Sequence, residues 1–181
     1  MEKHCNVEYI MLSERKIARR IKELGSQLDK YYEGRTPVVV CILKGSSIFF
    51  SDLIRSMKTT MNVDFMEVSS YGNGTKSSGE IVIKKDLSTD ITGRDVLIVE
   101  DIIDSGNTLY NLKKMLISRT PASVNIVTLL DKPARREAPI EPEYTGFVIE
   151  DEFVIGYGLD YAEEYRNLPY VGVLKRSVYE N

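Results

Sequence analysis

The stretch V-L-I-V-E-D-I-I-D-S-G-N-T-L, residues 96–109, decides the fold of this chain. It opens with four apolar, mostly β-branched residues, a pattern typical of a strand buried in a parallel sheet. We expect the helix that follows to cover residues 111–117. The acidic and small polar residues in between therefore lie at the carboxyl end of a strand, where open α/β sheets bind their ligands.

Three carboxylates in this stretch are candidates for chemistry: Glu100, Asp101 and Asp104. The S-G-N-T turn after them favours a phosphate, because free N–H groups and the positive end of the dipole meet at a helix N-terminus. Carboxylates would repel a phosphate, so we expect them to hold ribose hydroxyls, a divalent cation or a proton in transfer. A structural explanation is also open, with Asp104 as a helix N-cap. Because neighbours on a strand point to opposite faces, two successive acids favour function.

The rest of the chain alternates between strands and helices. Such alternation predicts an α/β fold with a mainly parallel central sheet flanked by helices. A long Gly/Ser-rich loop at residues 69–80 is typical of a functional or mobile segment. The expected helices are residues 13–28 and 48–57, and the expected strands are residues 38–43, 63–68, 81–83, 123–130 and short runs around Leu87, Phe147, Phe153 and Leu174.

Composition excludes several classes of protein. The chain has 181 residues, 43% of them hydrophobic, which fits one domain with a sizeable core. A formal net charge of −3 gives no sign of a basic face for nucleic acid. Two cysteines are too few for a disulfide framework, and the single histidine argues against His-based catalysis. No apolar run reaches membrane-spanning length and no signal peptide is evident, so we expect a cytoplasmic protein without a membrane partner.

Several other polar positions follow predicted strands. Lys44 and Gly45 form either an ordinary turn or a backbone site for an anion. Lys132 is either a surface charge or a donor to a carbonyl or anionic oxygen. Ordinary core or salt-bridge roles also explain four positions near the C-terminus: Phe153, Val154, Asp160 and Arg166.

Together these segments resemble a known family. Residues 96–109 are similar to the phosphoribosyl-diphosphate signature of the purine phosphoribosyltransferases, in their hypoxanthine-guanine branch. Four further segments fall in that family's order and spacing: L-K-G at 43–45, S-S-Y-G at 69–72, L-L-D-K at 129–132 and F-V-I-G-Y-G-L-D-Y…Y-R-N-L at 153–168. The resemblance covers nearly the whole chain. It implies one domain of the type I fold over residues 1–181, with a hood from the N-terminal segment and about residues 145–181, and a mobile lid at about residues 69–80.

The resemblance implies purine salvage, in which 5-phosphoribosyl 1-diphosphate (PRPP) and a purine base give a nucleotide and pyrophosphate with the help of Mg²⁺. Glu100 and Asp101 would hold the ribose hydroxyls, partly through the metal shell, and Asp160 would ligate Mg²⁺. Asn107 stands where some relatives carry a lysine, which bears on how strongly the loop attracts phosphate. The other PRPP contacts would come from two loops and one arginine: Leu43, Lys44, Gly45, Ser105, Gly106, Asn107, Thr108 and Arg166.

The same resemblance assigns the purine site. Asp104, which would also border PRPP, would handle the proton at N7 of the base. Lys132 would donate to the exocyclic O6, which suits hypoxanthine or guanine and disfavours adenine. Phe153 would stack on the base, Val154 would contact its edge through the backbone, and Asp160 would lie nearby. The lid would include Ser70 and Tyr71.

Two other functions compete with this one. A relative of this fold could bind a nucleotide or RNA as a regulator without turnover, although no added nucleic-acid-binding segment is present. A different phosphate-binding α/β enzyme, such as a nucleotide hydrolase, would need a G-x-x-x-x-G-K-[ST] sequence, which is absent. The choice among hypoxanthine, guanine and xanthine stays open, as does the choice between a homodimer and a homotetramer.

Overall fold

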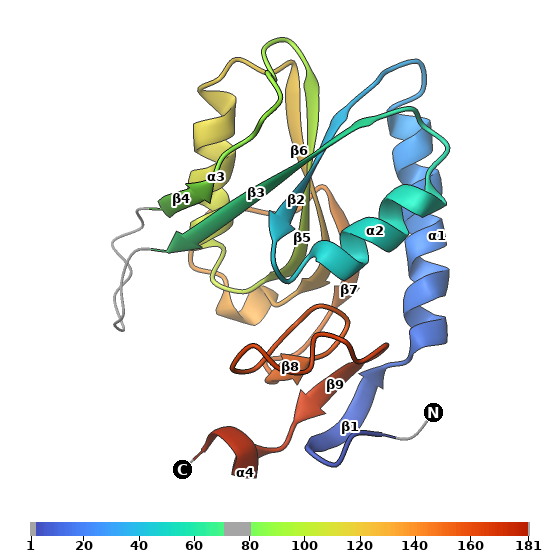
Figure 1. The fold of residues 1–181 in the computed structure, drawn as a ribbon, viewed down its shortest axis with the longest axis vertical. Helices are drawn as coiled ribbons and strands as arrows, with labels where there is room; N and C mark the ends of the chain where they lie inside the picture. The colour runs from blue at the N-terminus through green and yellow to red at the C-terminus, as the bar shows by residue number, and fades with distance from the viewer. Residues whose placement is uncertain (1–2, 71–80, 181) are drawn as a thin grey trace.

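A computed structural model describes residues 3–70 and 81–180 of the chain (Figure 1). Its main feature is a six-stranded sheet with the order β4-β3-β2-β5-β6-β7. All neighbouring strands are parallel except β3 and β4, which run antiparallel. The predicted α/β fold with a mainly parallel sheet is therefore confirmed. The strands are β2 (Val38–Leu43), β3 (Asn62–Ser70), β4 (Ile81–Lys85), β5 (Asp95–Ile103), β6 (Ser123–Asp131) and β7 (Tyr144–Val148).

The two central strands are buried on both faces, as their unbroken apolar runs predict. Side chains of β2 and β5 alternate between two core clusters. Val39 and Leu97 pack with the helices α1 (Glu14–Tyr31) and α2 (Ser47–Ser56), whereas Val40 and Ile98 pack with α3 (Asn107–Ile117). The sheet is therefore covered by helices on both faces.

The beginnings of two helices test the sequence predictions. Ser13 is the N-cap of α1, because its side chain accepts a hydrogen bond from the Lys16 amide at 3.4 Å. The predicted start of α3 at residue 111 is wrong, since the helix begins at Asn107. Gly106 is its N-cap, with a left-handed φ of 80°, and so Asp104 is not a cap. Glycine takes this conformation at little cost, which lets the helix begin directly after the acidic residues.

A second, three-stranded antiparallel sheet joins the two ends of the chain. It contains β1 (Val7–Leu12), β9 (Val171–Leu174) and β8 (Val154–Ile155), in that order, and is followed by a short helix, α4 (Arg176–Tyr179). Figure 1 shows this sheet beyond the carboxyl end of β2. It lies in the region predicted as the hood, whereas Tyr144–Val148, at the edge of that region, is β7 of the large sheet.

The predicted lid begins inside β3, because Ser69 and Ser70 belong to that strand. Tyr71 and the rest of the predicted lid lie outside the described residues. The strand after it, β4, is antiparallel to β3 as expected and ends at Lys85, before Leu87. Across the described ranges, no helix combines the length and the apolar character needed to cross a membrane.

Candidate active site

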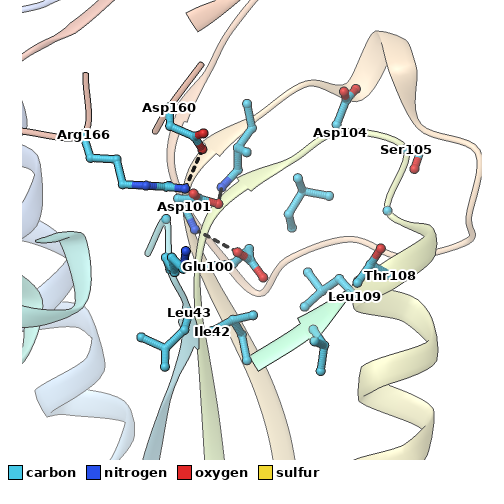
Figure 2. A pocket seen from close by; sticks show the side chains of 16 residues that line it. Ile42, Leu43, Glu100, Asp101, Asp104, Ser105, Thr108, Leu109, Asp160 and Arg166 are labelled. Atoms are coloured by element: carbon cyan, nitrogen blue, oxygen red, sulfur yellow. Dashed lines mark hydrogen bonds and ion pairs between the residues drawn. The ribbon is translucent and has the colours of Figure 1, made fainter. Parts of the chain in front are cut away.

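A cavity of about 340 Å³ lies at the carboxyl ends of β2 and β5 (Figure 2). Polar residues from three separated parts of the chain line it, together with an apolar wall that includes Ile102 and Val68. Nothing in the sequence distinguishes this wall, since its residues are ordinary apolar strand residues. The cavity brings together these predicted residues: Leu43, Lys44, Gly45, Glu100, Asp101, Asp104, Ser105, Gly106, Thr108, Asp160 and Arg166.

One wall is the turn between β2 and α2, where the Leu43–Lys44 peptide is cis. The turn is packed so closely that glycine is required in it. A Cβ atom on Gly45 would lie 1.7 Å from Oδ2 of Asp101, and one on Gly158 would lie 2.0 Å from the carbonyl oxygen of Gly45. Gly45 therefore meets the side chain of Asp101 on one side and the backbone of Gly158 on another.

Two adjacent carboxylates form the floor of the cavity. Burial raises the pKa of Glu100 well above its ordinary value, and the charge of Asp101 raises it further. Burial also raises the pKa of Asp101, although its Oδ1 accepts a hydrogen bond from the Ile102 amide at 2.7 Å. Because both acids resist ionisation as a pair, the site favours a ligand that brings positive charge or hydroxyl donors.

These carboxylates suit Mg²⁺ as hard oxygen ligands. Within residues 3–70 and 81–180, however, no three acidic, His or Cys side chains are gathered closely enough to form a metal site. The predicted ligand Asp160 is instead paired with Arg166, with 2.8 Å between Oδ1 and Nη2. This arrangement fits Mg²⁺ all the same, since the ion is usually held by one or two carboxylates together with substrate phosphates and waters.

Arg166 offers a free donor to an anionic ligand. Its Nη1 donates to the Gly158 carbonyl at 2.8 Å and its Nη2 faces Asp160. Its Nε is buried, and among the described residues nothing accepts a hydrogen bond from it. An unpaired buried donor costs about 1–3 kcal/mol, so an oxygen of a bound ligand is its natural partner.

Lys44, predicted to lie at a site for an anion, is paired with a carboxylate of the protein. Its Nζ lies 3.0 Å from Oε2 of Glu163, and both side chains are more than half exposed. The Lys44 ammonium is the main cause of the lowered pKa of Glu163. Glu163 could not be predicted from the sequence, because an acidic residue in E-E-Y-R looks like any other surface carboxylate.

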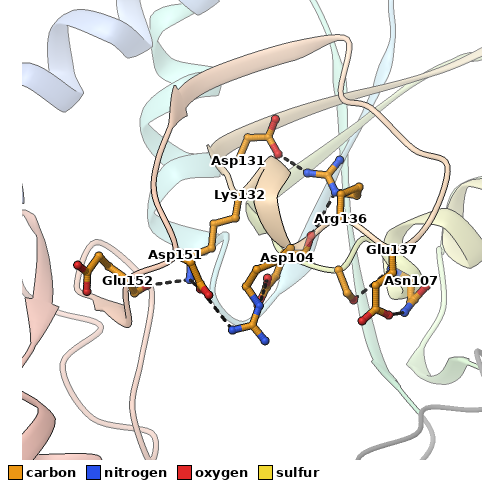
Figure 3. A network of polar contacts seen from close by, with 10 residues as sticks. Asp104, Asn107, Asp131, Lys132, Arg136, Glu137, Asp151 and Glu152 are labelled. Carbon is orange, nitrogen blue, oxygen red and sulfur yellow. Dashed lines mark hydrogen bonds and ion pairs between the residues drawn. The ribbon is translucent and has the colours of Figure 1, made fainter.

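The turn at the start of α3 is braced from behind by the segment after β6 (Figure 3). The carbonyl oxygen of Ser105 accepts hydrogen bonds from the amides of Glu137, at 2.9 Å, and Ala138, at 3.1 Å. Asn107 is drawn toward this segment, since its side chain donates to Oε2 of Glu137 at 2.8 Å, and it does not line the cavity. The turn predicted to bind phosphate thus presents Ser105, Gly106 and Thr108 to the cavity without the Asn107 side chain.

The partly buried Arg136 anchors this segment to the turn. Its Nε donates to the Asp104 carbonyl oxygen at 3.1 Å and its Nη1 donates to the Ile140 carbonyl oxygen at 2.6 Å. Its Nη2 is paired with Asp131 at the end of β6. In the sequence, only the basic run A-R-R at residues 134–136 points to a contact of this kind with a carboxylate.

Of the residues predicted for the purine site, Asp104 and Asp160 line the cavity, whereas Lys132, Phe153 and Val154 do not. Lys132 is buried, and its Nζ donates to the Glu152 carbonyl oxygen at 2.7 Å. Val154 is buried in β8, whereas Phe153 is 38% exposed. Lys132 and Phe153 therefore flank the same short segment before β8.

A chain of charges connects Lys132 with the cavity (Figure 3). Lys132 Nζ lies 3.7 Å from Oδ1 of Asp151, which lies 3.3 Å from Nη1 of Arg135. Arg135 Nε in turn lies 2.9 Å from Oδ1 of Asp104. Asp104, predicted to handle the purine proton, and Lys132, predicted to donate to O6, are thus linked through Asp151 and Arg135. Neither of these two linking residues was predicted from the sequence.

Comparison with known proteins gives a family for this geometry. Residues 10–162 match the family described as "Phosphoribosyl transferase domain". A hypoxanthine-guanine phosphoribosyltransferase of Bacillus subtilis is 52% identical over 181 residues, which is 100% of both chains. A crystal structure of a hypoxanthine phosphoribosyltransferase from Staphylococcus aureus superposes with a TM-score of 0.95 at 54% identity, covering 97% of this chain and 96% of that one.

A similar sequence also occurs within longer proteins. A "Bifunctional protein TilS/HprT" of Listeria innocua is 54% identical over 176 residues, which is 97% of this chain but 27% of the Listeria protein. The chain therefore spans about a quarter of the length of these bifunctional relatives and nearly all of the length of the others.

Proposed function

The chain belongs to the phosphoribosyltransferase family, in its hypoxanthine-guanine branch, and from this we propose that it transfers the 5-phosphoribosyl group of PRPP to hypoxanthine and guanine. The products are IMP or GMP and pyrophosphate, which makes the reaction a step of purine salvage. The resemblance inferred from the sequence motifs is confirmed at the level of the family.

One observation carries the proposal: a single cavity combines a pair of carboxylates with raised pKa values, an unpaired arginine donor and the N-terminus of α3. PRPP carries chemistry for each of them. Its ribose hydroxyls face Glu100 and Asp101, its 5′-phosphate is held by the turn at residues 105–108, and its diphosphate faces Arg166 and the turn at residues 43–45. Glu100, Asp101 or Asp160 would hold Mg²⁺ together with the diphosphate, and the ion would supply positive charge beside the leaving group.

In the proposed reaction a ring nitrogen of the purine forms a bond to C1′ while the bond from C1′ to the pyrophosphate oxygen breaks. Asp104 accepts the proton that the purine gives up, which is general base catalysis. Lys132 donates to O6 and Phe153 stacks on the base, while the backbone of Val154 contacts its edge. A lid that includes Ser70 and Tyr71 closes over the cavity and excludes water.

Pyrophosphate release measured with purified protein, PRPP and Mg²⁺ tests this function. We expect turnover with hypoxanthine and guanine and none with adenine, whose amino group cannot accept a hydrogen bond from Lys132. A protein that binds PRPP or GMP but releases no pyrophosphate with hypoxanthine, guanine or xanthine would instead be a regulator. Rates with these three bases also settle the base preference.

We further propose that the protein works in the cytoplasm as a homodimer or homotetramer. Both cysteines, Cys5 and Cys41, have free thiols, which suits a reducing compartment. Light scattering coupled to size-exclusion chromatography distinguishes the two assemblies, and a monomer at micromolar concentration would contradict both.

A further inference from the structure

The C-terminal helix places a second aromatic ring on Phe153. The ring of Tyr179, in α4, lies parallel to that of Phe153, with 4.9 Å between centroids and 24° between planes. Tyr161 meets the same phenylalanine edge-on, with 5.6 Å between centroids and 84° between planes. Phe153 is therefore stacked against one tyrosine and in T-shaped contact with another, and these two tyrosines lie 18 residues apart in the sequence.

Backbone hydrogen bonds fix where α4 begins. The Leu174 amide donates to the Phe153 carbonyl oxygen at 2.8 Å, and the Lys175 amide donates to the Asn6 carbonyl oxygen at 2.9 Å. The hydroxyl of Tyr161 reaches the Val178 carbonyl oxygen at 3.5 Å. These hydrogen bonds tie the start of α4 to the three-stranded sheet. They therefore place the ring of Tyr179 close to Phe153, which directly precedes β8.

The same segment also holds the proposed O6 donor. Lys132 Nζ donates to the carbonyl oxygen of Glu152, the residue immediately before Phe153. An aromatic ring offers two faces for stacking, and one face of Phe153 is covered by Tyr179. Phe153 nevertheless remains 38% exposed, and the Lys132 ammonium is held at the residue immediately before it.

We propose that Tyr179 is a positioning residue for the purine base, because it holds the Phe153 ring in the plane on which the base stacks. The inference rests on the proposed function, in which Phe153 is the stacking platform. It assigns to the C-terminal helix a part in base binding and none in PRPP binding.

Steady-state kinetics of Tyr179→Ala and Tyr179→Phe test the inference. Aromatic pairs contribute about 0.5–1.5 kcal/mol beyond burial, so Tyr179→Ala should raise the KM for hypoxanthine about three- to tenfold. The KM for PRPP should stay within about twofold, and Tyr179→Phe, which keeps the ring, should behave like the unchanged protein. Tyr9→Ala removes an exposed tyrosine from the same small sheet and is the matched control.

A parallel variant, Phe153→Ala, separates the inference from the proposed function. If Phe153→Ala leaves the KM for hypoxanthine unchanged, the stacking role in the proposed function is wrong. If Phe153→Ala raises this KM while Tyr179→Ala does not, the inference alone is overturned. A lower KM in Tyr179→Ala would also overturn it, since the tyrosine would then compete with the purine for Phe153. Should Tyr179→Ala unfold, Tyr179→Leu keeps an apolar contact without stacking and should show the same selective rise.

Discussion

Arg135 Nε lies 2.9 Å from Oδ1 of Asp104, the carboxylate proposed to accept the purine proton. The charge of Asp104 is the main cause of the raised pKa of Arg135, and Asp151 adds to it. The contact is an ion pair rather than a directed hydrogen bond, because Oδ1 accepts no well-aligned donor. One carboxylate oxygen thus faces a cation, which leaves Oδ2 for the base.

The ion pair between Arg135 and Asp104 should contribute only modestly to catalysis. Its side chain is 52% exposed, and exposed ion pairs contribute at most about 1 kcal/mol. We expect Arg135→Ala to lower kcat/KM for hypoxanthine by less than about fivefold. The difference should shrink in 0.5 M salt, which screens exposed charges. Arg135→Lys is the control that keeps the charge, and a hundredfold loss in Arg135→Ala would show that Arg135 acts directly on the substrate.

Loss of the Asp104 carboxylate should lower kcat far more than loss of Arg135. Asp104→Asn removes the base and keeps the shape of the side chain, so kcat should fall by about 10²–10⁴-fold, the range of general acid–base catalysis. The KM for PRPP should change little. Asp151→Asn removes a carboxylate from the same charge network outside the cavity and serves as the control. An unchanged rate of nucleotide formation in Asp104→Asn would refute the proton-transfer role.

The close contact between Gly158, which follows β8, and Gly45, which lines the cavity, predicts that a side chain at position 158 would disturb the cavity. A Cβ there would approach the Gly45 carbonyl oxygen to 2.0 Å, and the φ of Gly158 is +101°. Gly158→Ala should therefore displace the turn at Gly45, raise the KM for PRPP at least about tenfold and lower the free energy of unfolding by about 1–3 kcal/mol.

Gly34→Ala controls for backbone strain. Gly34 also has a left-handed φ, of +72°, yet a Cβ on it would have no atom within 4 Å. It should cost about 1 kcal/mol of stability and leave the KM for PRPP unchanged. Equal kinetics for the two variants would show that the contact with Gly45 does not matter for binding.

The sequence was sufficient to predict the central strands and most of the cavity. The apolar runs of β2 and β5 are continuous, and each leads directly into its functional turn, so local pattern and site coincide. The start of α3 was not predictable in the same way. A left-handed Gly106 allows the helix to begin within S-G-N-T, whereas small polar residues alone favour a turn.

Contacts between distant segments were the part that the sequence could not provide. Asp104, Arg135 and Asp151 lie in three different loops, which follow β5, β6 and β7. The parallel pairing of β5 with β6 brings the loops of Asp104 and Arg135 together. Tyr179 reaches Phe153 through the pairing of β8 with β9. Charge or aromaticity at single positions does not encode such pairings, because most exposed charges and tyrosines have no fixed partner.

The buried acid pair predicts a dependence of stability on pH. Burial, and then the charge of Asp101, raise the pKa of Glu100 well above its ordinary value of 4.5. The folded protein therefore binds this proton more tightly than the unfolded chain does. Stability is then highest below about pH 4.5 for this group, and it declines as the pH rises toward the pKa of the folded state.

Glu100→Gln removes this penalty, since glutamine stays neutral at every pH. We expect the variant to be more stable than the unchanged protein at pH 8, because the raised pKa of Glu100 lowers the stability of the unchanged protein above about pH 4.5. The difference should disappear toward pH 4, where Glu100 is protonated in both states. Urea unfolding at several pH values without Mg²⁺ measures it, with Glu141→Gln as the control for loss of an exposed carboxylate. A variant that is less stable at pH 8 would mean that ionised Glu100 has a stabilising partner.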